Sequence, residues 1–187
     1  MKTTKLGNVL VIAVAATVLA RCGHNPAGSD VLPPPDGQYQ AVLSAVSGSG
    51  VGGVSVTPQA VASRTFDAII RVRVQRARAN ATYFIQRAPE VGRANGADGA
   101  CQRALGQAPW SPSDPPAPAF VTFPLPTTPG PLTALTTLAD GSGSIEFEFA
   151  VPAIPAGTAF DVMFRVVDDV AAPTAELRST CFTVTAK

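Results

Sequence analysis

The chain has little of what catalysis and metal binding commonly use. Its one histidine, His24, lies before any segment that is patterned like a folded domain. A serine–histidine–aspartate or cysteine–histidine arrangement within the domain is therefore excluded, and so is a histidine-based zinc site. The sequence also lacks a glycine-rich phosphate-binding loop. We expect no cofactor and no resident metal ion.

Charged and aromatic side chains are scarce as well. Charged residues make up 14% of the 187 residues, with one Trp and two Tyr, whereas an average soluble domain has about 25% charged residues. Three of the 14 basic residues, Lys2, Lys5 and Arg21, precede Cys22, which leaves 11 basic against 13 acidic side chains and a net charge of −2. This balance argues against a polyanion-binding protein, so we expect no nucleic-acid partner.

Long apolar runs are absent except at the N-terminus. Residues 9–20 are almost all apolar and follow Lys2 and Lys5, which is the pattern of a secretory signal. The run is too short for a transmembrane helix, which needs about 20 apolar residues. We therefore predict a signal peptide over 1–21, a Pro/Gly-rich tether over 22–37 and one folded domain over 38–187.

The cysteine that follows the apolar run suggests a lipid anchor. The segment Leu19-Ala20-Arg21-Cys22 resembles the lipobox of bacterial lipoproteins, although that class has a small residue at the place of Arg21. The resemblance implies a lipid on Cys22 and attachment to the cell envelope, at the outer membrane in a two-membrane bacterium because Gly23 follows the cysteine. The alternative is cleavage after Ala20, which would give a secreted or periplasmic protein.

The other two cysteines, Cys101 and Cys181, remain as a pair if Cys22 carries lipid. Export places them in an oxidising compartment, where a disulfide is the expected state. The bridge would close a loop of about 80 residues and stabilise the fold by about 4–5 kcal/mol in the chain-entropy model.

Alternation of apolar and polar residues predicts strands throughout the domain. The clearest runs cover residues 66–75, 143–151, 158–168 and 177–186, and weaker ones cover 38–46, 53–58, 81–87, 119–123 and 132–138. The pattern predicts an all-β fold, a single antiparallel Ig-like β-sandwich of about 7–9 strands. The mature sequence resembles uncharacterised secreted bacterial Ig-like β-sandwich proteins. We also expect a hairpin turn at 78–81.

One long segment, residues 89–118, does not alternate. It is rich in Gly, Ala and Pro and contains Cys101. The last strand should bury Thr180 and Phe182, which turns Cys181 to its outer face, and Met163 should point outward on a neighbouring strand. We therefore expect the 89–118 segment to cover that outer face, held there by the disulfide, with a short helix near 99–105.

Arginines form the most suggestive cluster for binding. Six lie within 24 residues: Arg64, Arg71, Arg73, Arg76, Arg78 and Arg87. One interpretation is an anionic-ligand patch formed by Arg71, Arg73, Arg76 and Arg78. The favoured interpretation is a solvated strand face, on which Arg71 and Arg73 lie beside Glu146 and Glu148 in pairs worth about 0–1 kcal/mol each.

Three weaker candidates complete the set of sites. Trp110 and Tyr83 could form a carbohydrate- or peptide-binding loop, but a lone Trp in a Pro-rich loop usually packs inward. Glu146 and Glu148 could serve as acid and base, although a solvated sheet face is the simpler interpretation. The acidic pair at Asp168 and Asp169 could bind Ca²⁺ with backbone oxygens, or could simply form an acidic turn.

These observations favour a non-enzymatic β-sandwich that acts as a binding or structural module, either anchored to the cell envelope or secreted. Its partner would be an unknown protein or glycan, with the membrane reached through the lipid on Cys22. The alternatives are a carbohydrate-binding domain that uses the Trp110 loop and a hydrolase that uses Glu146 and Glu148.

We predict that the mature protein begins at Cys22 and carries a diacylglyceryl group. Intact-mass spectrometry of the protein purified from membranes should give the mass of residues 22–187 plus lipid. A mature N-terminus at Arg21 with unmodified Cys22 would contradict this prediction and support simple secretion.

Overall fold

The computed structural model describes residues 37–60, 65–93, 95–107, 119–124 and 130–187. The predicted signal peptide, Cys22, the tether up to residue 36, Arg64 and Trp110 lie outside these residues. No helix in the described ranges is long and apolar enough to cross a membrane.

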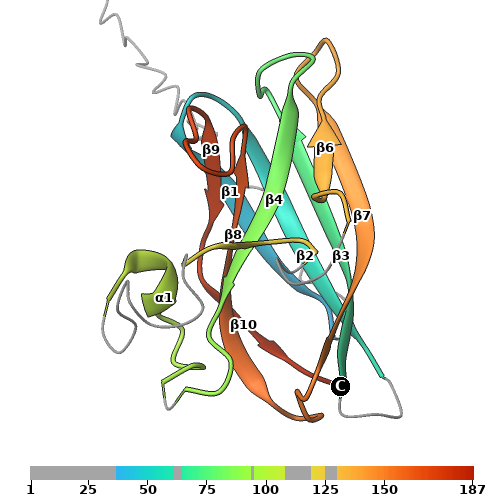
Figure 1. Cartoon of the computed structure of the whole chain (residues 1–187), viewed down its shortest axis with the longest axis vertical. Coiled ribbons are helices and arrows are strands. Elements are labelled where there is room, and N and C mark those ends of the chain that lie inside the picture. The colour runs from blue at the N-terminus through green and yellow to red at the C-terminus, as the bar shows by residue number, and fades with distance from the viewer. Residues whose placement is uncertain (1–36, 61–64, 94, 108–118, 125–129) are drawn as a thin grey trace, which may run out of the picture. The chain divides into compact units, whose positions relative to one another are not determined.

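The described chain is all-β, as predicted, and its strands are antiparallel (Figure 1). The one helix among the described residues, α1, has four residues, Gln102–Leu105. The strands are β1 Tyr39–Ser47, β2 Val51–Gln59, β3 Thr65–Gln75, β4 Thr82–Pro89, β5 Val121–Thr122, β6 Ala134–Thr136, β7 Gly143–Pro152, β8 Ala159–Val167, β9 Glu176–Ser179 and β10 Phe182–Thr185.

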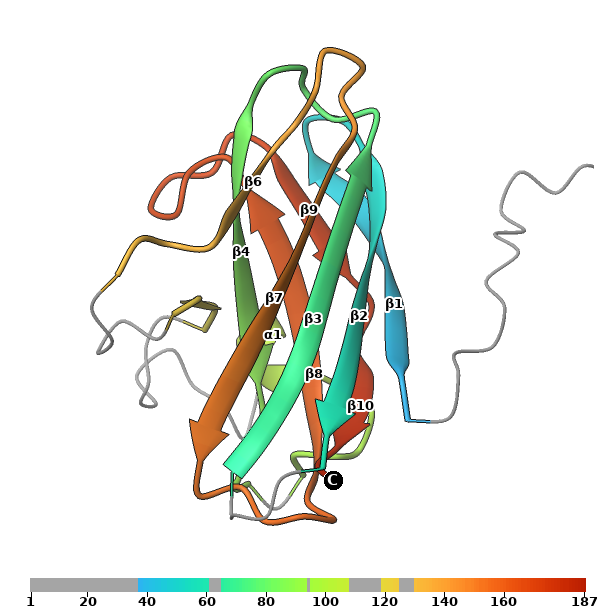
Figure 2. The same ribbon diagram turned by 90° about the vertical axis from the view of Figure 1, so that its right-hand side faces the viewer.

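A single hydrogen-bonded path joins the main strands in the order β5-β4-β8-β9-β1-β2-β3-β7, with β10 paired to β8 and β6 to β4. Strand β1 pairs with β2 on one side and with β9 on the other. The two halves of the path face each other, with β1, β2, β3 and β7 in front of β4, β8, β9 and β10 (Figure 2). The structure therefore has one continuous sheet that folds over its core.

Alternating side chains from both halves form this core. On β3, the residues predicted to face inward, Ala68, Ile70, Val72 and Val74, are at most 2% exposed. The rings of Phe66 on β3 and Phe160 on β8 meet edge to face with centroids 5.3 Å apart. Burial of these rows removes apolar surface from water and supplies the main driving force for folding.

The predicted hairpin between the third and fourth strands is wrong. Strand β3 pairs with β2 and β7, whereas β4 pairs with β5, β6 and β8. The turn between them instead carries the chain from one half of the sheet to the other. It is held by the loop before β7, because Ala77 N–H donates to Gly141 O and Asn80 N–H donates to Leu138 O.

The predicted C-terminal strand is interrupted. Thr180 is exposed rather than buried, and the chain forms β9 and β10 on either side of Thr180 and Cys181. At the break, Ser179 Oγ accepts the N–H of Phe164 and donates to Thr180 O, at 2.9 and 2.7 Å. The Ser179 hydroxyl thus makes hydrogen bonds with backbone groups at the point where the regular strand pairing is interrupted.

The 89–118 segment is fixed as predicted where it is described. Cys101 and Cys181 form a disulfide with Cα atoms 5.6 Å apart. Cys101 packs with Ala88, Phe120 and Met163 in a small second core on the outer side of β8. The short helix expected in this region is α1. The disulfide is compatible with an exported protein.

Two buried carboxylates add to this attachment. Asp161 on β8 accepts hydrogen bonds from the N–H of Gly99 at 2.7 Å and from Thr183 Oγ1 at 2.5 Å. Within the segment, Glu90 Oε1 accepts the N–H of Arg103 at 2.5 Å, which ties α1 to the residue that follows β4. The segment is therefore held by hydrogen bonds to side chains as well as by the covalent bridge.

Reduction of the disulfide should release the segment around α1 before the sheet unfolds. We expect trypsin to cut first after Arg93 or Arg103 in the reduced protein, and in a Cys101→Ser, Cys181→Ser variant, because the small second core is separate from the main core. Limited proteolysis with mass spectrometry of the fragments is the measurement. Reaction of both cysteines with a thiol reagent in the unreduced native protein would contradict the bridge itself.

Candidate functional site

Among the described residues, β7 is the one long strand whose core-facing row of apolar side chains is only half-buried. Ile145, Phe147, Phe149 and Val151 all face the core, yet each is only partly buried. The reason is the sheet order, because β7 ends the path and, among the described strands, pairs only with β3. We call the open side between β7 and the segments that carry Phe123 and Thr133 the seam.

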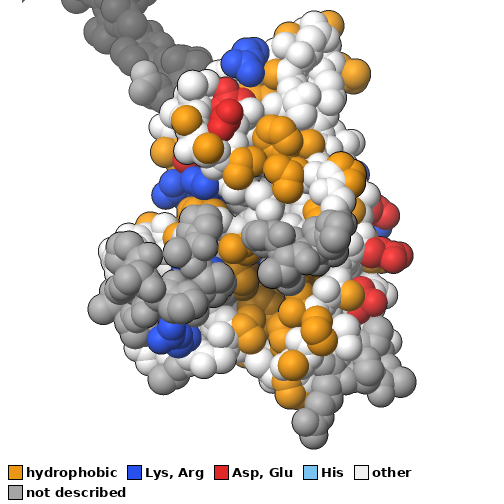
Figure 3. Space-filling model, in the orientation of Figure 1, with side chains coloured by type: hydrophobic (Ala, Val, Ile, Leu, Met, Phe, Trp, Pro, Cys, Tyr) orange, Lys and Arg blue, Asp and Glu red, His pale blue; other side chains and the backbone are white. Residues whose placement is uncertain are grey.

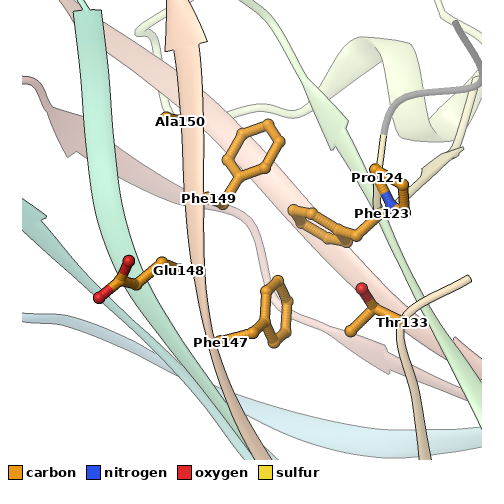
Figure 4. A pocket seen from close by; sticks show the side chains of 7 residues that line it. All are labelled: Phe123, Pro124, Thr133, Phe147, Glu148, Phe149 and Ala150. Carbon is orange, nitrogen blue, oxygen red and sulfur yellow. The ribbon is translucent and has the colours of Figure 1, made fainter. Parts of the chain in front are cut away.

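Phe123, which follows β5, partly closes the seam. Its ring meets Phe147 and Phe149 edge to face, with centroids 5.0 and 4.9 Å apart, and stacks on Phe164 at 6.1 Å. Figure 4 shows Phe147 and Phe149 projecting from the same side of β7 toward Phe123. These ring contacts connect the two ends of the sheet path, β5 and β7, which are not paired with each other in the described part of the chain.

A cavity of about 260 Å³ remains in the seam. Thr133 contributes the one hydroxyl group of its lining. Glu148 also borders it, but Figure 4 shows its carboxylate on the opposite side of β7 from the rings, so the group does not point into the cavity. The full lining is Phe123, Pro124, Thr133, Phe147, Glu148, Phe149 and Ala150.

Arg87 fixes the position of Phe123 by packing against its ring. Its guanidinium carbon lies 4.0 Å from the ring centroids of both Phe123 and Phe149, and Nη1 donates to Thr122 O at 2.9 Å. The side chain is only 5% exposed. Burial, together with the charge of Arg103, lowers the pKa of Arg87 to about 9. Cation–π contacts of a desolvated cation contribute about 2 kcal/mol.

The sequence pattern grouped Arg87 with arginines on a solvated strand face. In the structure Arg87 is buried, so this prediction is wrong for Arg87. The rings that cover its guanidinium come from β7 and from the residue after β5, far away in the sequence. Alternation in β4 places Arg87 on the same buried face as Tyr83 and Ile85, but it does not identify the rings that cover the guanidinium.

The outer face of β7 is polar and acidic. Glu146 lies directly opposite Arg71 on β3, and the two side chains form the predicted ion pair. Arg73 lies opposite Ser144, and Glu148 lies opposite Ile69, so the strand register brings only Arg71 directly opposite one of the two predicted glutamates. In Figure 3, acidic side chains at the right-hand edge, where β7 runs, border a hollow with exposed hydrophobic side chains.

The four arginines of the predicted anionic patch do not form one uncompensated surface. Arg71 is neutralised by its glutamate, and the guanidinium of Arg78 lies 3.6 Å from the carboxylate of Asp168. Arg73 faces solvent on β3, while Arg76 lies in the turn beyond it with a φ of 55°. The charges are therefore spread along a strand and a turn.

The acidic pair after β8 supports a turn. Asp168 accepts hydrogen bonds from the N–H groups of Thr174 and Ala175, and Asp169 accepts those of Ala171 and Ala172. Burial opposes ionisation of Asp168, but hydrogen bonds from the Thr174 hydroxyl and from the N–H groups of Ala175 and Thr174, together with the charge of Arg78, lower its pKa. The described residues contain no group of three or more metal-ligating side chains.

One of the two residues predicted to form an aromatic binding loop is not accessible to a ligand. Tyr83 is completely buried, and its hydroxyl accepts the N–H of Arg78 at 3.2 Å. A ring in that position cannot stack on a sugar. The other member, Trp110, lies outside the described residues.

The comparisons with known proteins add no family: no family model, no curated protein and no solved structure matches the chain.

Arg87 should make the free energy of unfolding increase with pH in the alkaline range. Because its pKa is lower in the folded chain, the unfolded chain binds more protons above about pH 9, and stability rises with pH there. The free energy of unfolding of the native protein, relative to an Arg87→Met variant, should increase by about 1 kcal/mol between pH 8 and pH 10. Urea titrations at each pH measure the difference, and a constant difference would contradict the lowered pKa of Arg87.

Proposed function

We propose that the chain is a non-enzymatic binding module, exported and anchored to the cell envelope through Cys22, and that the seam beside β7 takes its ligand. The observation that carries the proposal is the half-buried row on β7 together with the cavity against Phe123. A concave site lined mainly by aromatic side chains with a few polar groups is typical of ligand binding.

The closure of the seam also supports binding. The two borders of the cavity meet through ring contacts, with no backbone hydrogen bonds between β7 and β5 among the described residues. Side chains can change rotamer without breaking a strand ladder. A ligand could therefore enter beside Phe147 and Phe149 at little cost to the sheet.

The hydrolase alternative has less support. Glycoside hydrolysis of the usual kind needs two carboxyl groups that flank one bond. Glu146 is bound to Arg71, and the carboxylate of Glu148 points away from the cavity. The carbohydrate alternative depends on Trp110 alone, because Tyr83 is buried.

Indole, a small aromatic probe, tests whether the seam accepts a ligand. In ¹H–¹⁵N spectra of the isotope-labelled protein, indole should shift the amide signals of Phe147, Phe149 and Thr133. A Thr133→Trp variant should lose these shifts because the larger side chain fills the cavity.

The matched control is Thr136→Trp, which adds the same side chain at an exposed position on β6. It should keep the indole response. Indole shifts confined to other parts of the protein would contradict the seam as the binding site. Hydrolytic turnover that disappears in Glu148→Gln would favour an enzyme.

A further inference from the structure

Strand β7 has a free edge along the seam. Its backbone pairs with β3 on one side, and the described residues place no paired strand on the other. In an antiparallel pair, alternate residues turn their N–H and C=O groups away from the partner. Roughly four residues between Ile145 and Pro152 therefore present hydrogen-bonding groups to the seam.

Strand β6 limits this edge at one end. A side-chain carbon added at Gly143 would lie 3.0 Å from both Leu135 Cδ1 and Thr136 O, a tight contact that glycine avoids. Beyond Gly143 the edge borders the cavity. The accessible part of the edge thus coincides with the half-buried apolar row.

The side chains of β7 specify what could pair there. On the inner side, a new strand would place alternate residues against Phe147 and Phe149. On the outer side, its other residues would lie beside Glu146 and Glu148. Glu146 is engaged by Arg71, whereas Glu148 has no ion pair or hydrogen bond among the described residues. Apolar residues on one face and a basic residue on the other would complement β7.

We propose that the seam binds an extended segment of another protein, which pairs with the free edge of β7 and alternates apolar with basic side chains. This proposal rests on the proposed function, because it specifies the ligand of the same seam. Backbone hydrogen bonds to β7 supply affinity, as in other cases of strand addition, and the cavity and Glu148 supply selectivity.

A second copy of the chain fits the edge less well. When two β7 edges pair antiparallel in the registers centred on Phe147 or Glu148, glutamates of one copy face glutamates of the other. Like charges directly opposite each other on a sheet are destabilising. Charges on an edge strand are a common means of preventing such self-pairing.

The test uses the full chain and three kinds of fluorescent seven-residue peptide, measured by fluorescence anisotropy. The first alternates valine and lysine, and the second alternates valine and glutamate. The third kind is the lysine peptide with backbone N-methyl groups, placed either on the even or on the odd residues. We expect the lysine peptide to bind, the glutamate peptide to bind at least tenfold more weakly, and only one of the two N-methylated peptides to lose binding.

Charge reversal locates the bound peptide on β7. In Glu148→Lys, affinity for the lysine peptide should fall about five- to tenfold, while the glutamate peptide gains affinity. The matched control is Asp67→Lys, which makes the same charge change on the same outer face but on β3, away from the free edge. This control should retain the preference for the lysine peptide. Hydrogen exchange should slow at β7 amides when the peptide binds.

Four outcomes would overturn the proposal. Equal binding of both N-methylated peptides would indicate attraction by charge alone. Equal effects of Glu148→Lys and Asp67→Lys would place the peptide elsewhere. Protection of β7 that rises with protein concentration, without peptide, would identify a second copy as the occupant. If indole binds in the seam but no peptide does, strand addition fails and the proposed function stands; if neither binds, both fail.

Discussion

The contact of one arginine with two phenylalanine rings closes the side of the core that the strand order leaves open. Arg87 reaches from β4 to Phe149 on β7 and to Phe123 after β5, and it also binds the carbonyl of Thr122. A guanidinium is suited to this place because its flat faces pack on rings while its edge donates hydrogen bonds. With it, the two ends of the sheet path meet without pairing.

Closure by side chains rather than by a ladder has a functional consequence. The apolar row of β7 remains half-buried, next to a cavity and to an unpaired strand edge. Every other strand of eight or more residues in the described chain has partners on both sides, and β8 is also covered by the disulfide-bound segment around α1. The proposed binding site thus lies where the sheet stops.

Much of the fold could be predicted from the sequence. The alternation of apolar and polar residues is a local signal, and the disulfide follows from the number of cysteines. Alternation identified the inward row of β3, and the pairing of Cys101 with Cys181 followed from having two cysteines left after Cys22. Met163 pointed outward as expected and lies under the segment held by that disulfide.

The seam could not be predicted in this way. Alternation places Phe147 and Phe149 on one face, but it does not say that β7 ends the sheet. That depends on β3 and β4 belonging to different halves, which no turn signal reveals. The burial of Arg87 and Tyr83 likewise depends on residues distant in the sequence.

The disulfide also determines how the protein would respond to a pulling force. Its cysteines are separated by 80 residues, and β5 to β9 lie between them. A load applied at the two ends of the chain would pass from Cys101 directly to Cys181 and bypass the strands in between. Such a load could extend β1 to β4 and β10, while the enclosed residues, β7 among them, add no length to the stretched chain.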